Sequence, residues 1–358
     1  MIVVTGASVN EVFARACGMV LDRGASVAPR GLETREVMGA YLRLTDPRRR
    51  LLDLPPVRIL NPAFAVAETV WILSGSDDPW IYDFNDSLRQ FADDGILQGA
   101  YGPRMRRWRA SSWPSSPPAT GVSGRGVMGG ERARAGLVVD QLDSVRSLLV
   151  ADPDSRRAVI QLFDPSRDFL GHRDIPCTLG YRFYLRQGKL DMYTTMRSQD
   201  LWLGFGYDVF AATVLQEFLA GWLGVELGEY HHHVDSLHLY APVLERAAAI
   251  QVDPPSGEIV EVPAIAWDDF DHALRGLASS QPGGGIGEVP ATGAWPEAAI
   301  VLDSYRRWKA GDRAGARHRL DARSGVIAQA LKRWYRHLDE HLSHPLGSSD
   351  PPSAEVIS

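Results

Sequence analysis

Lysine is scarce in this chain of 358 residues, where it occurs only as Lys189, Lys309 and Lys332. Arginine supplies the rest of the 38 basic side chains, and the 44 acidic ones leave a formal net charge of −6. That balance provides no overall basic field for nucleic acid, which argues against a general nucleic-acid-binding role. The planar arginine side chain suits phosphate and carboxylate groups, but lysine this rare beside abundant alanine and glycine indicates the coding bias of a GC-rich genome.

Cysteine is also nearly absent, with only Cys17 and Cys177 in the chain. Two cysteines are too few for a disulfide framework and are consistent with a reducing compartment. No apolar run is long enough to cross a bilayer, and the N-terminus lacks the charged-then-apolar pattern of a secretion signal. We therefore expect a soluble protein of the cytoplasm.

Three helices are predicted in the first half of the chain from periodicity and capping residues. Ser8 suits the N-cap and Gly24 the end of the first, while Asn61-Pro62 opens the second and Gly75 closes it. The three predicted helices cover residues 8–23, 61–73 and 141–151.

The middle of the chain alternates in the manner of strands. A β-rich stretch at 156–163 precedes a hairpin over 178–197, with Gln187-Gly188 at its turn. In the second hairpin strand Leu190, Met192, Thr194 and Met196 face one way, and Asp191, Tyr193, Thr195 and Arg197 the other. An apolar helix over 209–223, a strand over 229–240 and a helical region from about 297 to 342 complete the prediction.

Composition suggests how the chain is divided. We expect a catalytic domain over 1–278 that carries a mobile insert, rich in Ser, Pro and Gly, at 110–135. A linker at 279–294 should lead to a C-terminal helical extension at 295–343, and a disordered tail should follow at 344–358.

Cys177 lies in "RDIPCTLGYRF", where Pro176 fixes the backbone just before a predicted strand. Most buried cysteines are inert apolar side chains, whereas a reactive thiol needs nearby cations that favour the thiolate. Arg197, on the neighbouring strand, and the pair Arg156-Arg157 are candidates for such cations. The paired arginines are either a solvated strand end or a phosphate clamp, and Arg30, in a loop beside a glycine, has the same two interpretations.

Two carboxylates stand in apolar surroundings. Glu68 is the only charge between Asn61 and Ser74. It lies either on a polar helix face or in an apolar site that would raise its pKa for proton transfer. Asp208 precedes the apolar run 209–219 and is an N-cap, a surface residue, or a group directed at something polar.

Three consecutive histidines, His231, His232 and His233, suggest a metal site at first sight. On a strand, however, the first and third share a face while the second points away, and no standard ligand spacing completes a tetrahedron. We therefore expect no metal. His238 and Tyr240 share one strand face, which favours a joint hydrogen-bonding role.

Taken together, these pieces resemble the thymidylate synthase family in order along about 230 residues. The matching segments are "PRG" (29–31), "ETVWILSG" (68–75), "AYGPRMRRW" (100–108), "DPDSRRAVI" (152–160), "PC" (176–177), "RFYLRQGKL" (182–190), "RSQDLWLG" (197–204) and "HLY" (238–240). The resemblance implies an α/β fold, a thymidylate synthase-type sandwich of a mixed β-sheet with flanking helices, plus the C-terminal helical extension.

The resemblance also implies residue roles. Cys177 would be the nucleophile that adds to C6 of a pyrimidine nucleotide, while Glu68 and Tyr101 organise water and proton transfer. Asp200 would hold the pterin of a 5,10-methylenetetrahydrofolate cofactor. The nucleotide ligands would be Arg30, Arg197 and Ser198 at the phosphate, His238 and Tyr240 at the sugar, and Arg156 and Arg157 from the other subunit of a homodimer.

Asp208 departs from the family pattern, in which this position is an asparagine that pairs with N3–H and O4 of uracil. Cytosine has an amino donor at C4 beside a ring nitrogen that can be protonated. A carboxylate accepts from that amino group but meets O4 of uracil lone pair to lone pair. The family members that have this exchange are hydroxymethylases of cytidylates, so we expect Asp208 to recognise a cytosine base.

Leu88 is a second departure. Thymidylate synthases commonly have a tryptophan here that shields the exocyclic methylene intermediate, so a leucine would leave that methylene open to water. Thr178 replaces the histidine that usually follows the nucleophile, and "VDSLHLY" replaces the usual segment before "HLY". The latter change leaves the choice between ribose and deoxyribose open.

The sequence thus predicts 5-hydroxymethylation of CMP, or of dCMP, with methylenetetrahydrofolate and water. By analogy it favours CMP and a role in nucleoside-antibiotic biosynthesis of the mildiomycin kind. The alternatives are methylation of dUMP by a thymidylate synthase, a non-catalytic nucleotide- or RNA-binding protein of the same fold, and a hydrolase built from Cys177 and His238.

Overall fold

The computed structural model describes residues 2–109, 138–251, 253–278 and 295–343. The predicted insert at 110–135, the linker at 279–294 and the tail at 344–358 lie outside the described residues.

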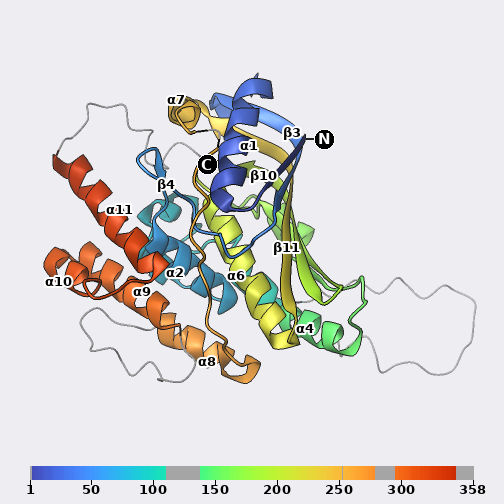
Figure 1. Ribbon diagram of the computed structural model, residues 1–358. Helices are drawn as coiled ribbons and strands as arrows, with labels where there is room; N and C mark the ends of the chain where they lie inside the picture. The colour runs from blue at the N-terminus through green and yellow to red at the C-terminus, as the bar shows by residue number, and fades with distance from the viewer. Residues whose placement is uncertain (1, 110–137, 252, 279–294, 344–358) are drawn as a thin grey trace, which may run out of the picture.

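A mixed sheet of seven strands forms the centre of the molecule (Figure 1). Parallel pairing joins the first pair, β1 with β3, and the central pair, β11 with β10, and the other neighbours are antiparallel. The strands run in the order β1 (Ile2–Gly6), β3 (Thr34–Leu44), β11 (Glu226–Tyr240), β10 (Lys189–Asp200), β9 (Thr178–Arg186) and β8 (Val159–Gln161), with β2 (Ala25–Val27) paired to β3. This architecture confirms the predicted α/β class.

The predicted helices and hairpin are confirmed in most of their bounds. The first helix, α1 (Val9–Arg23), has Ser8 as its N-cap, whose hydroxyl accepts a hydrogen bond from Glu11 N. The second, α2 (Pro62–Leu73), is capped by the Asn61 side chain. The third is α4 (Gln141–Ala151). The hairpin of β9 and β10 turns at Gln187-Gly188, both with positive φ, and the predicted apolar face of β10 is buried.

Two boundaries differ from the prediction. The helix predicted from residue 209 begins four residues earlier, as α6 (Phe205–Leu223), with Gly204 as its N-cap. Asp208 therefore lies inside the first turn, which excludes the N-cap interpretation. The β-rich stretch at 156–163 yields only the three residues of β8 as a strand, although Ala158 and Leu162 on either side also bond to the backbone of β9.

The C-terminal helices pack against α2 rather than standing apart (Figure 1). Tyr305 stacks on Phe84 with ring centroids 5.6 Å apart, and Arg333 pairs with Asp53. The helices on α2 are α9 (Pro296–Lys309) and α11 (Val326–Ser343), and α10 (Arg313–His318) packs on α9. The remaining helices are α3 (Tyr101–Arg106), α5 (Pro165–Asp168), α7 (Leu244–Ala248) and α8 (Trp267–Ala278). The domain boundaries proposed from composition remain a prediction.

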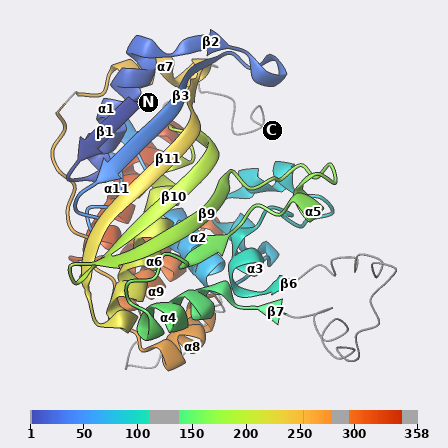
Figure 2. The same cartoon turned by 90° about the vertical axis from the view of Figure 1, so that its right-hand side faces the viewer.

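The two faces of the sheet differ. Helices α1, α2 and α6 lie behind it in Figure 2, whereas β3, β10 and β11 face the viewer. On this open face His231 stacks between Tyr41 and Tyr193, with ring centroids 5.8 and 4.2 Å away. Beside them Arg43 donates two hydrogen bonds of 2.6 Å to Glu229. Among the helices of the described residues, none is long and apolar enough to cross a membrane.

Candidate active site

Cys177 lies just before β9, and the neighbouring strand fixes its loop. The backbone N–H of Arg197 donates to the Cys177 carbonyl over 2.9 Å, and the Arg197 side chain donates to the carbonyls of Pro176 and Ile175 over 3.0 Å each. Burial raises the pKa of the Cys177 thiol, and the Arg197 charge opposes that rise. The predicted neighbouring cation is thus present, although burial is the larger influence.

A cavity of about 150 Å³ opens beside this loop and brings together side chains that are far apart in sequence. Four of the predicted site residues line it: Glu68, Leu88, Tyr101 and Asp208. Tyr101 also connects the cavity to the cysteine, because its hydroxyl accepts a hydrogen bond of 3.2 Å from the N–H of Thr178, the next residue after Cys177.

Glu68 reaches the cavity from the middle of α2, among buried apolar residues. Burial, reinforced by the nearby Asp208 charge, raises the pKa of Glu68 to about 8. The side chain is therefore mostly protonated at neutral pH. Of the two interpretations from sequence, the structure supports the buried acid.

Asp208 reaches the same cavity from the first turn of α6. Its Oδ2 accepts a hydrogen bond of 2.9 Å from Nε2 of Gln199, and no described residue bonds its Oδ1. Burial raises the pKa of Asp208 to about 6, against the lowering effect of the Gln199 hydrogen bond. The carboxyl thus presents one free oxygen to the cavity and is mainly ionised above pH 6.

A buried chain of hydrogen bonds holds Gln199 in one orientation. Nε2 of Gln199 also lies 3.1 Å from the Asp200 carbonyl, so both amide hydrogens face acceptors and Oε1 must accept from His232 Nε2 at 3.0 Å. Burial lowers the pKa of His232 to about 3, so its ring is neutral and has one donor nitrogen. His232 Nδ1 lies 2.7 Å from the Tyr230 hydroxyl, which also bonds Thr194 Oγ1 at 3.0 Å. Because the Asp200 carbonyl can only accept, the Gln199 amide directs a hydrogen, and not its oxygen, at Asp208.

Asp200 lies at the end of β10, and its Oδ1 accepts hydrogen bonds from the N–H groups of Trp202 and Leu203 at 2.8 and 2.9 Å. Its Oδ2 is buried without a hydrogen-bond partner among the described residues. An unpaired buried carboxylate oxygen is costly, so this atom is suited to an external donor. The N–H groups of a pterin ring fit that requirement.

His238 and Tyr240 follow on the adjacent strand β11, where His238 is the register partner of Asp200. Their rings are perpendicular with centroids 5.1 Å apart, and both side chains are buried. Burial raises the pKa of Tyr240, and the neighbouring Arg30 opposes this by charge and by a hydrogen bond. Arg30 itself is exposed and has a φ of 55°. The structure thus places Arg30 beside the predicted sugar ligands.

A family model described as thymidylate synthase matches residues 11–263 of this chain. The chain belongs to the thymidylate synthase family. Among curated proteins it is 35% identical over 281 residues to a protein of Bacillus phage SP01 named deoxyuridylate hydroxymethyltransferase. That alignment covers 75% of this chain and 67% of the phage protein.

Two further phage proteins share the same name. The one from Pseudomonas phage M6 is 30% identical over 231 residues, which cover 63% of this chain and 56% of the relative. The one from Delftia phage PhiW-14 is 32% identical over 212 residues, which cover 55% and 50%. The chain therefore spans between half and two thirds of the length of these relatives.

For three residues of the predicted nucleotide site the structure gives a location but no role. Arg156 and Arg157 are exposed just before β8, and Arg157 lies 3.8 Å from Asp152. Their contribution across a subunit interface remains a prediction. Ser198 lies on β10 between Arg197 and Gln199, half-buried. Within the described residues no group of three or more His, Cys, Asp or Glu could hold a metal ion.

Sequence reasoning missed three side chains of this thymidylate synthase-family site: Gln199, His232 as a hydrogen-bond partner, and Asp174. The alternation of β11 did separate His232 from its two neighbours, but nothing in the sequence shows which side chain it meets. Asp174 sits in an irregular loop three residues before Cys177, where no periodicity signals its direction.

Proposed function

We propose that this protein is a cytidylate 5-hydroxymethyltransferase, which transfers a one-carbon unit from 5,10-methylenetetrahydrofolate to C5 of CMP or dCMP and adds water. The single observation that carries the choice of base is Asp208, which lines the cavity and among the described residues has a side-chain hydrogen bond only at Oδ2, from Gln199. The fold, the family and the side chains around Cys177 support the type of reaction.

The nucleophilic step is assigned to Cys177. Its thiolate adds to C6 of the pyrimidine, which turns C5 into an enamine-like carbon that can attack the one-carbon unit. Arg197 favours the thiolate by its charge and holds the loop by its hydrogen bonds to Ile175 and Pro176. Glu68, with its raised pKa, is suited to proton transfer at the base through water, and Tyr101 to the proton at C5.

Recognition of the base is assigned to Asp208. Cytosine presents an N4 amino donor beside N3, so a carboxylate accepts from the amino group and shares one proton with the ring nitrogen. Uracil presents O4 instead, which an ionised Asp208 repels. The orientation of Gln199 supports an acceptor at position 208, because its amide nitrogen donates both to the Asp200 carbonyl and to Asp208 Oδ2.

The folate is assigned to Asp200, whose unpaired Oδ2 matches the N–H donors of a pterin. When bound, the folate supplies a carbon at the oxidation level of formaldehyde. The nucleotide phosphate is assigned to Arg30, Arg197 and Ser198, and the sugar to His238 and Tyr240. We also propose a homodimer, with the open face of the sheet as its interface and Arg156 and Arg157 completing the partner's phosphate site.

The relatives give a second candidate function. Each is named for hydroxymethylation of deoxyuridylate, so they support the same product chemistry on a uracil base. Burial of Asp208 favours this candidate at low pH, because a protonated carboxyl donates to O4 while it accepts from N3–H. A place in nucleoside-antibiotic biosynthesis would follow from CMP, but not from deoxyuridylate, as the substrate.

The test is to incubate the protein with methylenetetrahydrofolate and CMP, dCMP, UMP or dUMP in separate reactions, and to weigh the nucleotides. We expect a gain of CH₂O on a cytidylate and none with Cys177→Ala. The same gain confined to uridylates would establish the second candidate. A gain of CH₂ would overturn the hydroxymethylation proposal, and activity of Cys177→Ala would overturn the assigned nucleophile.

A further inference from the structure

Asp174 is a carboxylate at the cavity that the proposed mechanism does not yet use. It lies in the loop before β9 and lines the cavity together with Leu88, Glu68, Tyr101 and Asp208. Its Oδ2 accepts a hydrogen bond of 2.9 Å from the N–H of Gly99, and no described residue donates to its Oδ1. One carboxylate oxygen is therefore fixed and the other is left for a small molecule.

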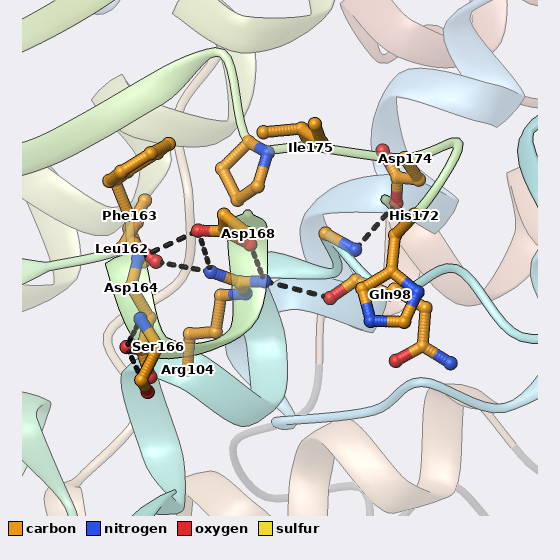
Figure 3. A network of polar contacts seen from close by, with 12 residues as sticks. Gln98, Arg104, Leu162, Phe163, Asp164, Ser166, Asp168, His172, Asp174 and Ile175 are labelled. Carbon is orange, nitrogen blue, oxygen red and sulfur yellow. Dashed lines mark hydrogen bonds and ion pairs between the residues drawn. The ribbon is translucent and has the colours of Figure 1, made fainter. Parts of the chain in front are cut away.

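The two loops that meet at Asp174 are fixed by a buried ion pair. Arg104 donates two hydrogen bonds, of 2.8 and 2.5 Å, to the carboxylate of Asp168, and both side chains are almost fully buried. Arg104 also donates to the Gln98 carbonyl over 2.9 Å. Figure 3 shows this pair beside the contact of Asp174 with the neighbouring loop. The hydrogen bonds of Arg104 to Asp168 and to the Gln98 carbonyl thus hold the two loops that position Asp174.

Gly99 makes the close approach possible. A Cβ atom at this position would lie 2.9 Å from the carboxyl carbon and from both oxygens of Asp174. Any side chain at residue 99 would therefore displace the carboxylate from the cavity. The absence of a side chain at Gly99 therefore allows the carboxylate to approach the backbone N–H this closely.

The charges around the cavity distinguish Asp174 from its neighbours. Burial raises the pKa of Glu68 to about 8, so Glu68 is mostly protonated at neutral pH. Asp208 is bound by Gln199 and faces the base in the proposed function. Burial also raises the pKa of Asp174, while the hydrogen bond from Gly99 and the charge of Arg104 oppose that rise. A carboxylate with a raised pKa is a stronger base than a free one.

We propose that Asp174 is the general base for the water that adds to the one-carbon unit on C5. This inference rests on the proposed hydroxymethylation. Leu88, at the position where the resemblance places the shielding tryptophan, lines the same cavity as Asp174, and Trp71 lines it as well. A site needs only roughly 10–15 Å³ for one water, and the cavity of about 150 Å³ leaves space for it.

The step balances without a further reactant. The water oxygen forms a bond to the exocyclic methylene carbon while Asp174 takes one of its protons. The electron pair of the exocyclic double bond moves to restore C5=C6, and the bond from C6 to the Cys177 sulfur breaks. The products are the 5-hydroxymethyl nucleotide, the Cys177 thiolate and a protonated Asp174 that later returns its proton to solvent.

The experiment separates the formation of the methylene from its capture. CMP carrying tritium at C5 releases that label when the methylene forms, before water adds. In a single turnover with methylenetetrahydrofolate, we expect Asp174→Asn to release tritium within about twofold of the wild-type rate. The hydroxymethyl nucleotide should form at least about 100-fold more slowly, since a general base contributes roughly 10²–10⁴ in rate. Added 2-mercaptoethanol, whose thiolate needs no base, should capture the methylene as a thioether in the variant.

Asp93→Asn is the matched control. Asp93 lies in the same region and contacts His172 and the N–H of Arg173, but it does not line the cavity. It should leave both rates near those of the wild type. Binding of CMP without folate, followed by calorimetry, and the unfolding temperature should be alike in all three proteins.

Two results would overturn the inference. One is equal loss of tritium release and product in Asp174→Asn, and the other is no loss of either. In the wild-type protein, heavy water should slow product formation but not tritium release, and the absence of that difference would also count against Asp174. If wild-type protein makes no hydroxymethyl nucleotide at all, the proposed function fails instead.

Discussion

The two sides of the cavity are built differently. The base side comprises Gln199, Asp208 and His232. Its hydrogen bonds join His232 to Gln199 and Gln199 to Asp208 in one chain. On the water side, which comprises Leu88, Gly99 and Asp174, one carboxylate has a single backbone donor and its neighbour is a leucine. We infer that the base side selects the nucleotide and the water side selects what becomes of the methylene, so that each can change without the other.

The largest effect is expected from Asp208→Asn on the base side. The amide donates to O4 and accepts from N3–H, so the preference should reverse from cytidylate to uridylate. A mismatched polar pair in a dry pocket costs several kcal/mol, which corresponds to a change of about 100- to 1000-fold in the ratio of kcat/KM values. The measurement is competition between CMP and UMP, and between dCMP and dUMP.

The product of that variant decides whether the two sides are independent. We expect Asp208→Asn to make a hydroxymethyl nucleotide still, now on uracil. A methylated product would show that the base side also controls the fate of the methylene.

His232→Phe should weaken the base side by a smaller amount. The substitution keeps a ring of similar size but removes the donor for Gln199 Oε1, so the amide loses its fixed orientation. A lost hydrogen bond of about 1–1.5 kcal/mol predicts roughly a tenfold drop in the cytidylate preference. The neighbouring His231→Phe, on the opposite face, keeps an aromatic ring between Tyr41 and Tyr193 and is the control, which should leave the preference unchanged. A uniform loss of activity on all four nucleotides would contradict a role in selection.

Leu88→Trp tests the water side. A larger ring over the methylene should exclude water and slow hydroxymethylation several-fold, while the preference between nucleotides stays constant. The check is the ratio of the product rate to the rate of tritium release from C5. An altered choice of base in this variant would contradict the division into two sides.

The smallest effect is expected from pH. Burial raises the pKa of Asp208 to about 6; the hydrogen bond from Gln199 lowers this pKa, and the charge of Asp200 raises it. Glu68, on the same cavity, has a pKa of about 8 and is mostly protonated below that pH. Below about pH 6 the protonated Asp208 can donate to O4, so uridylates should gain. We expect the cytidylate preference to fall a few-fold between pH 8 and pH 5.5, and Asp208→Asn to lack this change. A preference that rises as pH falls would contradict the assignment.

Much of the fold could be predicted because local signals define it. Capping by Ser8 and Asn61 fixes two helix starts, and the alternation of β10 matches its burial. The start of α6 could not be located, because Gly204 caps the helix by backbone alone and offers no side-chain signal. The strand β3 was missed because its alternation is interrupted at Gly39, which has a positive φ, so that Val37 and Ala40, three residues apart, are both buried.

The site residues likewise include some that the sequence could predict and some that it could not. Cys177 and Arg197, which lie in continuous motifs, are in contact through the hydrogen bonds of Arg197 to the cysteine loop, while their roles and that of Asp200 remain predictions. Contacts between residues distant in sequence could not be predicted: the His232 side chain bonds Gln199 although its register partner on β10 is Thr194, and Asp174 meets Gly99 only through two irregular loops.

Adjacent histidines on β11 have opposite surroundings: His231 stacks with Tyr41 and Tyr193 on the open face, and His232 belongs to the buried chain that ends at Asp208. Successive Cα atoms are about 3.8 Å apart, and the backbone of a strand is already extended, so it can hardly lengthen between these two residues. In the homodimer that we propose, a displacement of the His231 ring at the interface would shift the His232 ring, because a single peptide bond joins the two residues. Signalling between two active centres would then require no hinge, only the stiffness of one extended backbone.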